Sequence, residues 1–381
     1  MPDTPPSESD VLHHLAEQAF ALGRPDIAGE LLRQSTRSRP PRDDESGDSL
    51  HAAIERGDSG YANPYDPGAK EAFASFARDT WGWAPDPSRM SMTTDVSVVI
   101  VESLRRLIAP GEPVIITPPI YPPFYDLIPE AGGTVAEVAL TQDGLDLTGI
   151  EQTMATGARG VLLCNPHNPL GLVHSRETLV ELAEIVARHD GFVVSDEIHA
   201  PLTHYGQQFT PYLSVSDAAR AHGITAASGS KAFNLAGLKC ALFVAGSPAM
   251  ADLIAQLPDE VSFRTGQFGL IATREGFANS RDWLGETIAA IESNVALLAD
   301  QLRSKLPEVT MHEPHAGYLA WLDLSALNLG DDPARVLVSR AKVALSSGPD
   351  FGSPGRGHAR MNLACAPETV IEAVDRIAAA V

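Results

Sequence analysis

Short runs of β-prone apolar residues alternate with amphipathic helical patterns through the middle of the chain. The runs lie at 114–116, 135–138, 161–163, 192–194, 224–227 and 241–244. Between two of them, residues 176–189 place Leu179, Leu182, Ala183 and Val186 on one face of a predicted helix. Because strands that alternate with helices form parallel sheets covered on both faces, this stretch predicts an α/β domain with a mostly parallel sheet.

The two ends of the chain have other patterns. Apolar residues recur at helical spacing over about 11–32, where Arg24-Pro25-Asp26 predicts a break into two short helices. Residues 34–49, rich in Arg, Pro, Asp and Ser, predict an exposed linker. After Pro258 the pattern predicts a long helix over 268–306, short strands around 318–322 and 341–345, and a closing helix over 367–380.

These patterns predict a large domain and a smaller one. We expect residues 1–50 to form N-terminal helices and a linker that pack with the small domain. Residues 51–258 form the large domain, and residues 259–381 form a connecting helix and the C-terminal small domain. A chain of 381 residues is long enough for this division.

Composition narrows the function classes. The net charge of −21 argues against broad contact with nucleic acid or anionic lipid. The three cysteines show neither a disulfide framework nor metal-ligand spacing, and no signal peptide or membrane-spanning apolar run is apparent. We therefore expect a cytoplasmic protein that acts on a small molecule.

Three polar segments follow three successive β-runs. They are 164–171 (CNPHNPLG), 195–199 (SDEIH) and 228–231 (SGSK). Taken singly, Asn168 suits a structural turn, Asp196 a helix N-cap and Lys231 a solvated loop. Because the carboxyl ends of parallel strands meet at one sheet edge, we expect the three side chains to converge. An amine, a carboxylate for a ring nitrogen and small phosphate-binding residues together favour a site for pyridoxal 5′-phosphate (PLP).

The same segments resemble those of fold-type I PLP enzymes in the class I/II aminotransferase superfamily. The strings NPHNPxG, SDEIH and SKxFNLAGL are most similar to those of the MalY/PatB group of cystathionine β-lyase-like C–S lyases, and the resemblance extends from about Gly57 to the C-terminus. It implies a large domain with a mostly parallel central sheet and a smaller α+β domain.

The resemblance also implies roles for individual residues around the cofactor. Lys231 would form the Schiff base, Asp196 would contact the pyridine nitrogen and Tyr121 would stack on the ring. The other cofactor contacts that it implies are Asn168 on the phenolic oxygen, Ser228, Ser230 and Lys239 on the phosphate, and backbone N–H groups of Val96 and Ser97. His199 suits either a contact near the ring or ordinary packing.

Two further roles concern the substrate and a second subunit. Arg360, with Asn168 beside it, would hold the α-carboxylate of an amino-acid substrate, a task that suits a bidentate guanidinium. Tyr61 would reach the phosphate from the neighbouring subunit of a homodimer.

The sequence departs from the group in two places. A Trp-x-Ala-Asp-Met-Asp-Phe segment is replaced by residues 41–49, which bears on substrate identity. Asp95 stands where a glycine is expected and Ser97 where an apolar residue is expected. A carboxylate close to a phosphate is unfavourable unless its side chain turns away.

The resemblance favours β-elimination from an L-cysteine S-conjugate or a cystathionine-like substrate, giving a thiol, pyruvate and ammonia. The alternative is an aminotransferase acting on an amino acid. A sensory PLP fold attached to a transcription regulator is disfavoured by the acidity and by the lack of a basic DNA-binding segment.

Overall fold

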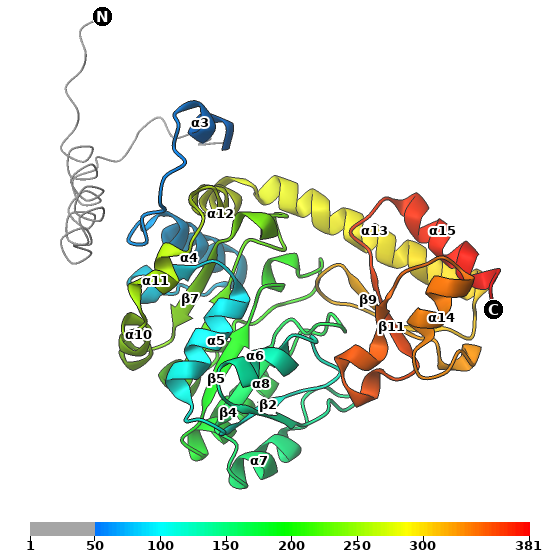
Figure 1. The fold of residues 1–381 in the computed structure, drawn as a ribbon, viewed down its shortest axis with the longest axis horizontal. Helices are drawn as coiled ribbons and strands as arrows, with labels where there is room; N and C mark the ends of the chain where they lie inside the picture. The colour runs from blue at the N-terminus through cyan, green and yellow to red at the C-terminus, as the bar shows by residue number, and fades with distance from the viewer. Residues whose placement is uncertain (1–49) are drawn as a thin grey trace, which may run out of the picture.

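The computed structural model describes residues 50–381, which form two sheets joined by one long helix (Figure 1). The predictions for 11–32 and 34–49, and for the packing of residues 1–50, lie outside the described residues. No helix within residues 50–381 combines the length and the apolar character that a bilayer crossing requires.

The larger sheet has seven strands in the order β1-β7-β6-β5-β4-β2-β3. The strands are β1 (Met90–Thr93), β2 (Pro113–Ile116), β3 (Thr134–Glu137), β4 (Gly160–Cys164), β5 (Phe192–Asp196), β6 (Gly223–Ala227) and β7 (Ala241–Ala245). Strands β2 to β6 are parallel, whereas β7 runs antiparallel to both β6 and β1. The mostly parallel sheet is therefore confirmed, while β1 was not predicted.

Helices cover both faces of this sheet because its strands are apolar on both sides. In β4, Val161 and Leu163 face one core, and Leu162 faces the other. The helices over the first core are α4 (Gly68–Trp81), α7 (Leu147–Ala155), α8 (Arg176–Arg188), α9 (Asp217–His222) and α12 (Gln267–Asn279). Those over the second are α5 (Val96–Leu107), α6 (Phe124–Glu130), α10 (Pro248–Ala255) and α11 (Asp259–Phe263).

The smaller sheet is antiparallel, in the order β10-β11-β9-β8. Its strands are β8 (Thr310–His312), β9 (Leu319–Asp323), β10 (Ser346–Ser347) and β11 (His358–Asn362). A third core forms where α14 (Pro333–Arg340), α15 (Pro367–Ala378) and the end of α13 (Arg281–Lys305) pack on this sheet. Helix α13 leads from α12, on the side of the large sheet, to the small sheet (Figure 1).

Two sequence predictions for the C-terminal third need correction. The single helix expected over 268–306 is two helices, α12 and α13, which meet at Ser280. The strand expected over 341–345 is wrong: Lys342 has a φ of +57°, and the chain pairs only later, at β10. Ala341 and Val343 are nevertheless buried, so the apolar pattern reflects packing without strand pairing.

Candidate active site

The carboxyl ends of β4, β5 and β6 bring the three predicted polar segments together. These strands are adjacent and parallel, with Cys164 opposite Asp196 and Asp196 opposite Ala226. Asn168, Asp196 and Lys231 all line one cavity of about 360 Å³. The convergence expected from the sequence is therefore present.

Asp196 is the last residue of β5 and its carboxyl is buried. One oxygen accepts a hydrogen bond from the N–H of Ile198 at 3.1 Å. Burial raises the pKa of Asp196 to about 7, while the backbone hydrogen bond and the nearby Lys231 act in the opposite direction. A cationic ring nitrogen in the cavity would stabilise this carboxylate in its charged form.

The turn after β6 presents Lys231 to the cavity over a pair of serine hydroxyls. The Ser228 and Ser230 hydroxyl oxygens lie 2.6 Å apart, and Ser228 donates to the Cys240 carbonyl at 2.8 Å. Ser230 lines the cavity. Ser228 is not among the lining residues, but its hydroxyl oxygen accepts a hydrogen bond from the N–H of Ser230 at 3.0 Å. The small residues thus let the chain turn tightly and place the amine at the strand end.

The N-terminus of α5 forms another wall of the same cavity through Asp95, Val96 and Ser97. The first N–H groups of a helix lack partners within the helix and attract anions. The Asp95 side chain makes no capping hydrogen bond; its two carboxylate oxygens lie 3.3 and 3.2 Å from the Nζ atom of Lys239. Lys239 pairs with Asp95 and is not among the residues that line the cavity.

Arg360 enters the cavity from the small sheet, on β11. Its guanidinium donates to Asn168 Oδ1 at 2.9 Å and to Ser346 Oγ at 3.2 Å, and it lies over the ring of Phe351 at 4.9 Å. Burial lowers its pKa from the usual value, although a guanidinium stays charged at neutral pH. The cavity is therefore built from both sheets.

Aromatic side chains form the remaining walls. Tyr121 lies half-buried between β2 and α6, and burial raises the pKa of its hydroxyl. The buried His199 packs edge-on against Tyr318 at 5.9 Å, and its Nδ1 atom has no hydrogen-bond partner among residues 50–381. Burial lowers the pKa of His199 to about 3, so its imidazole is neutral. His199 is among the residues that line the cavity, and its contact with the cofactor stays a prediction.

Tyr318 is a cavity residue that the sequence argument did not identify. It precedes β9, and its segment is fixed to the large sheet's loops by backbone bonds: Gly317 N–H donates to Leu202 at 2.9 Å, and His204 N–H donates to His315 at 2.9 Å. Cys164 and Asn362 also line the cavity without having been predicted. Cys164 ends β4 at the same sheet edge as Asn168, whereas Tyr318 and Asn362 reach the cavity only because the small sheet approaches the large one.

Tyr61 does not lie at this cavity. It is 74% exposed, in the segment between α3 (Leu50–Glu55) and α4. In Figure 1, α3 stands at the edge of the molecule above α12. Within one chain, Tyr61 is therefore not brought to the other predicted residues.

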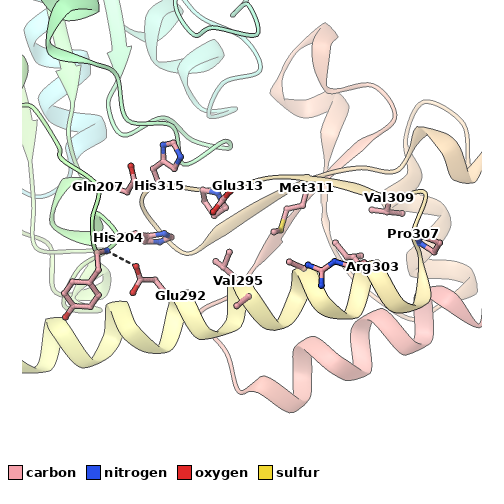
Figure 2. Close-up of a pocket in the computed structure, with 15 residues that line it drawn as sticks. His204, Gln207, Glu292, Val295, Arg303, Pro307, Val309, Met311, Glu313 and His315 are labelled. Carbon is pink, nitrogen blue, oxygen red and sulfur yellow. Dashed lines mark hydrogen bonds between the residues drawn. The ribbon is translucent and has the colours of Figure 1, made fainter.

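A larger cavity, of about 620 Å³, lies elsewhere along α13. Figure 2 shows Glu292, Val295 and Arg303 of α13 facing the segment that carries Met311 and Glu313. One oxygen of Glu292 accepts a hydrogen bond from the N–H of Tyr205 at 2.8 Å. None of the predicted site residues lines this cavity, so the volume of a cavity alone does not identify the candidate active site.

The residues of the smaller cavity fit PLP. Within residues 50–381 the buried Asp196 carboxyl has no ion-pair partner, His199 lines the same cavity with its Nδ1 unpaired, and the start of α5 lines it together with Ser230. These features match a ring nitrogen, a polar ring substituent and a phosphate. A primary amine and a guanidinium complete a site that can bind an amino acid and move its α-proton.

Comparisons with known proteins agree with this fit. The model of the family described as aminotransferase class I and II matches residues 34–377. A protein of Mycobacterium leprae named "Putative cystathionine beta-lyase" is 39% identical over 353 residues, covering 87% of each chain. Cystathionine β-lyase PatB of Bacillus subtilis is 32% identical over 340 residues, covering 87% of this chain and 88% of PatB.

A solved structure has the same architecture. The crystal structure described as a "putative plp-dependent beta-cystathionase" from Corynebacterium diphtheriae superimposes with a TM-score of 0.83 at 33% identity, covering 87% of each chain. PLP is therefore the cofactor of this protein, as the sequence predicted. The chain belongs to the class I and II aminotransferase family and, within it, to the MalY/PatB group of PLP-dependent enzymes.

Proposed function

We propose that this protein is a PLP-dependent carbon–sulfur lyase that acts by β-elimination on an L-cysteine S-conjugate or a cystathionine-like amino acid. The observation that carries the proposal is the placement of Lys231, Asp196 and Arg360 in one cavity. The relatives named cystathionine β-lyase support the elimination outcome.

Arg360 is the group that holds the substrate. Its hydrogen bonds to Asn168 and Ser346 leave the guanidinium inside the cavity, where it can bind an α-carboxylate. A charge-assisted contact of this kind is strong and orients the amino acid. Lys231 lines the same cavity, where its amine can reach the Cα proton of an amino acid held in this way.

Lys231 serves as the covalent anchor of the cofactor and then as the base. PLP, when bound, supplies an electron-withdrawing ring that takes up the charge developed at the substrate Cα. The Lys231 amine removes the Cα proton. The Asp196 carboxylate would stabilise the positive charge on the pyridine nitrogen of the cofactor. Tyr121 covers the cavity from the β2–α6 side.

The overall reaction balances without an oxidant or reductant. The Cα–H and Cβ–S bonds break, and the sulfur leaves as a thiol. With one water, the remaining three carbons and nitrogen become pyruvate and ammonium. Aminotransfer differs after the proton is removed, because the amino group stays with the cofactor and the C–S bond remains intact.

Product analysis tests the proposal. Purified holoenzyme is incubated with L-cystathionine or an S-alkyl-L-cysteine, and thiol and pyruvate are quantified against time. We expect the two products in equal amounts over many turnovers. Turnover only when a 2-oxo acid is added, without thiol release, would support aminotransfer instead.

We further propose that the enzyme works in the cytoplasm as a homodimer in which the partner's Tyr61 completes the phosphate site. The exposure of Tyr61 supports its contact with another chain. Three free cysteines, two of them buried, suit a reducing compartment.

A further inference from the structure

The Asp95 carboxylate lies at the end of the cavity formed by the start of α5, where we expect the cofactor phosphate. Asp95 immediately precedes α5, and its carbonyl accepts hydrogen bonds from Val98 at 3.0 Å and Val99 at 3.1 Å. The backbone thus places the carboxylate at the positive end of a twelve-residue helix. This is the location where the cofactor phosphate would be expected.

The carboxylate is paired with the cation predicted for the phosphate. Both oxygens of Asp95 lie within 3.3 Å of Lys239 Nζ. The backbone of Lys239 is fixed, because its carbonyl accepts a hydrogen bond from Gly266 N–H at 2.9 Å at the start of α12. Among the described residues that line the cavity, Asp95 and Asp196 are the only carboxylates, and Asp196 lies at the end of β5.

We propose that Asp95 is an internal competitor for the phosphate subsite, which shares Lys239 with the cofactor phosphate and weakens the grip on PLP. Lys239 has one positive charge, and a phosphate at the start of α5 would meet a carboxylate already bound to it. The repulsion between carboxylate and phosphate acts only on phosphorylated ligands. The inference depends on PLP binding and not on the reaction that follows.

The exposure of the pair sets the size of the effect. The Asp95 side chain is 34% exposed and that of Lys239 is 53% exposed, so solvent screens their interaction. Removing the Asp95 charge should therefore tighten PLP binding about five- to tenfold. Asn and Ser are both good residues at a helix start, so Asp95→Asn and Asp95→Ser keep α5 intact.

Equilibrium binding to the cofactor-depleted protein tests the inference. The dissociation constants of PLP and of pyridoxal, which lacks the phosphate, are measured for the wild type, Asp95→Asn, Asp95→Ser and Asp252→Asn. Asp252→Asn is the control for charge, because Asp252 is exposed on α10. We expect tighter PLP binding and unchanged pyridoxal binding in both Asp95 variants, with no change in Asp252→Asn.

Three results would overturn the inference. Unchanged PLP binding in both Asp95 variants would mean that Asp95 does not compete with the phosphate, and weaker binding would mean that it supports the phosphate through Lys239. An equal gain for pyridoxal would place the effect away from the phosphate, and an equal gain in Asp252→Asn would make it a property of net charge. None of these results depends on lyase activity, so the inference and the proposed reaction can fail separately.

Discussion

Arg360 shows how single residues from separate sheets combine into one subsite. Its guanidinium is held by Asn168, in the loop after β4 of the large sheet, and by Ser346 of the small sheet. We expect Arg360→Ala to raise KM for the amino acid roughly 100-fold, because a buried charged hydrogen bond to the carboxylate is lost. PLP affinity should stay unchanged.

Ser346 acts through Arg360 and should have a smaller effect. Ser346→Ala is expected to raise KM a few-fold with little change in kcat, since the guanidinium loses one of its two anchors. Steady-state kinetics of both variants would be compared with Arg356→Ala, whose side chain is exposed and pairs with Asp331. A fall in kcat at unchanged KM in Ser346→Ala would contradict the positioning role.

Glu197, next to Asp196, should make the free energy of unfolding depend on pH. Its carboxyl accepts hydrogen bonds from Ser195 at 2.9 Å and from Tyr212 at 2.8 Å, and burial raises its pKa to about 8. A carboxyl whose pKa is higher in the folded than in the unfolded protein stabilises the fold at low pH. That stabilisation is lost as the pH rises from its ordinary pKa of 4.5 towards 8.

We therefore expect the free energy of unfolding of the wild type, relative to that of Glu197→Gln at the same pH, to fall between pH 5 and about 8. Urea denaturation at several pH values would measure it. Glu181→Gln, on the exposed face of α8, is the control and should retain the wild-type slope. A slope in Glu197→Gln equal to that of the wild type would show that another group titrates.

At the scale of elements, α12 supports the loop that carries Lys231. Gly269 lies so close to this loop that an added Cβ would meet the Leu238 carbonyl oxygen at 2.2 Å, whereas a Cβ on Gly237 would meet nothing within 4 Å. We expect Gly269→Ala to cost about 1–3 kcal/mol of stability and to weaken PLP binding, because the backbone next to Lys239 must move. Gly237→Ala should change neither.

Thermal unfolding and PLP titration of these two variants separate close packing from a general effect of replacing glycine. If Gly269→Ala kept both wild-type stability and wild-type PLP affinity, the loop would not be held by α12 in the way described. Reduced stability of Gly269→Ala with wild-type PLP affinity would mean that α12 contributes to core packing and not to cofactor binding.

Elements with strong local patterns could be predicted from the sequence, and those that depend on distant partners could not. β4 to β7 and α8 follow from their apolar runs and helical spacing. β1 could not be predicted, because Met90–Thr93 is short and becomes a strand only by pairing with β7. The same holds for 341–345, where alternation of apolar residues arises from burial without a partner strand.

At the scale of the molecule, the site was predictable where motifs follow adjacent strands. Asn168, Asp196 and Lys231 converge because β4, β5 and β6 are neighbours. Tyr318 was missed because it faces the cavity only through the docking of the small sheet onto Leu202 and His204. The pairing of Lys239 with Asp95 joins residues 144 positions apart, which no local pattern indicates.

The proposed dimer predicts that two inactive variants complement each other. Lys231→Ala and Tyr61→Ala are purified separately, mixed, and allowed to exchange subunits. A mixed dimer has one site with both Lys231 and the partner's Tyr61, so about a quarter of wild-type activity should return. Recovery should be absent if Tyr61 serves its own chain or if the protein is a monomer in sedimentation.

The central claim is that removal of the Cα proton leads to cleavage of the C–S bond. It is tested most directly by counting, in the absence of any 2-oxo acid, the thiol released from L-cystathionine per molecule of PLP converted to pyridoxamine phosphate. The account predicts many thiols for each converted cofactor. One converted cofactor per active site, with no thiol, would contradict it and identify an aminotransferase.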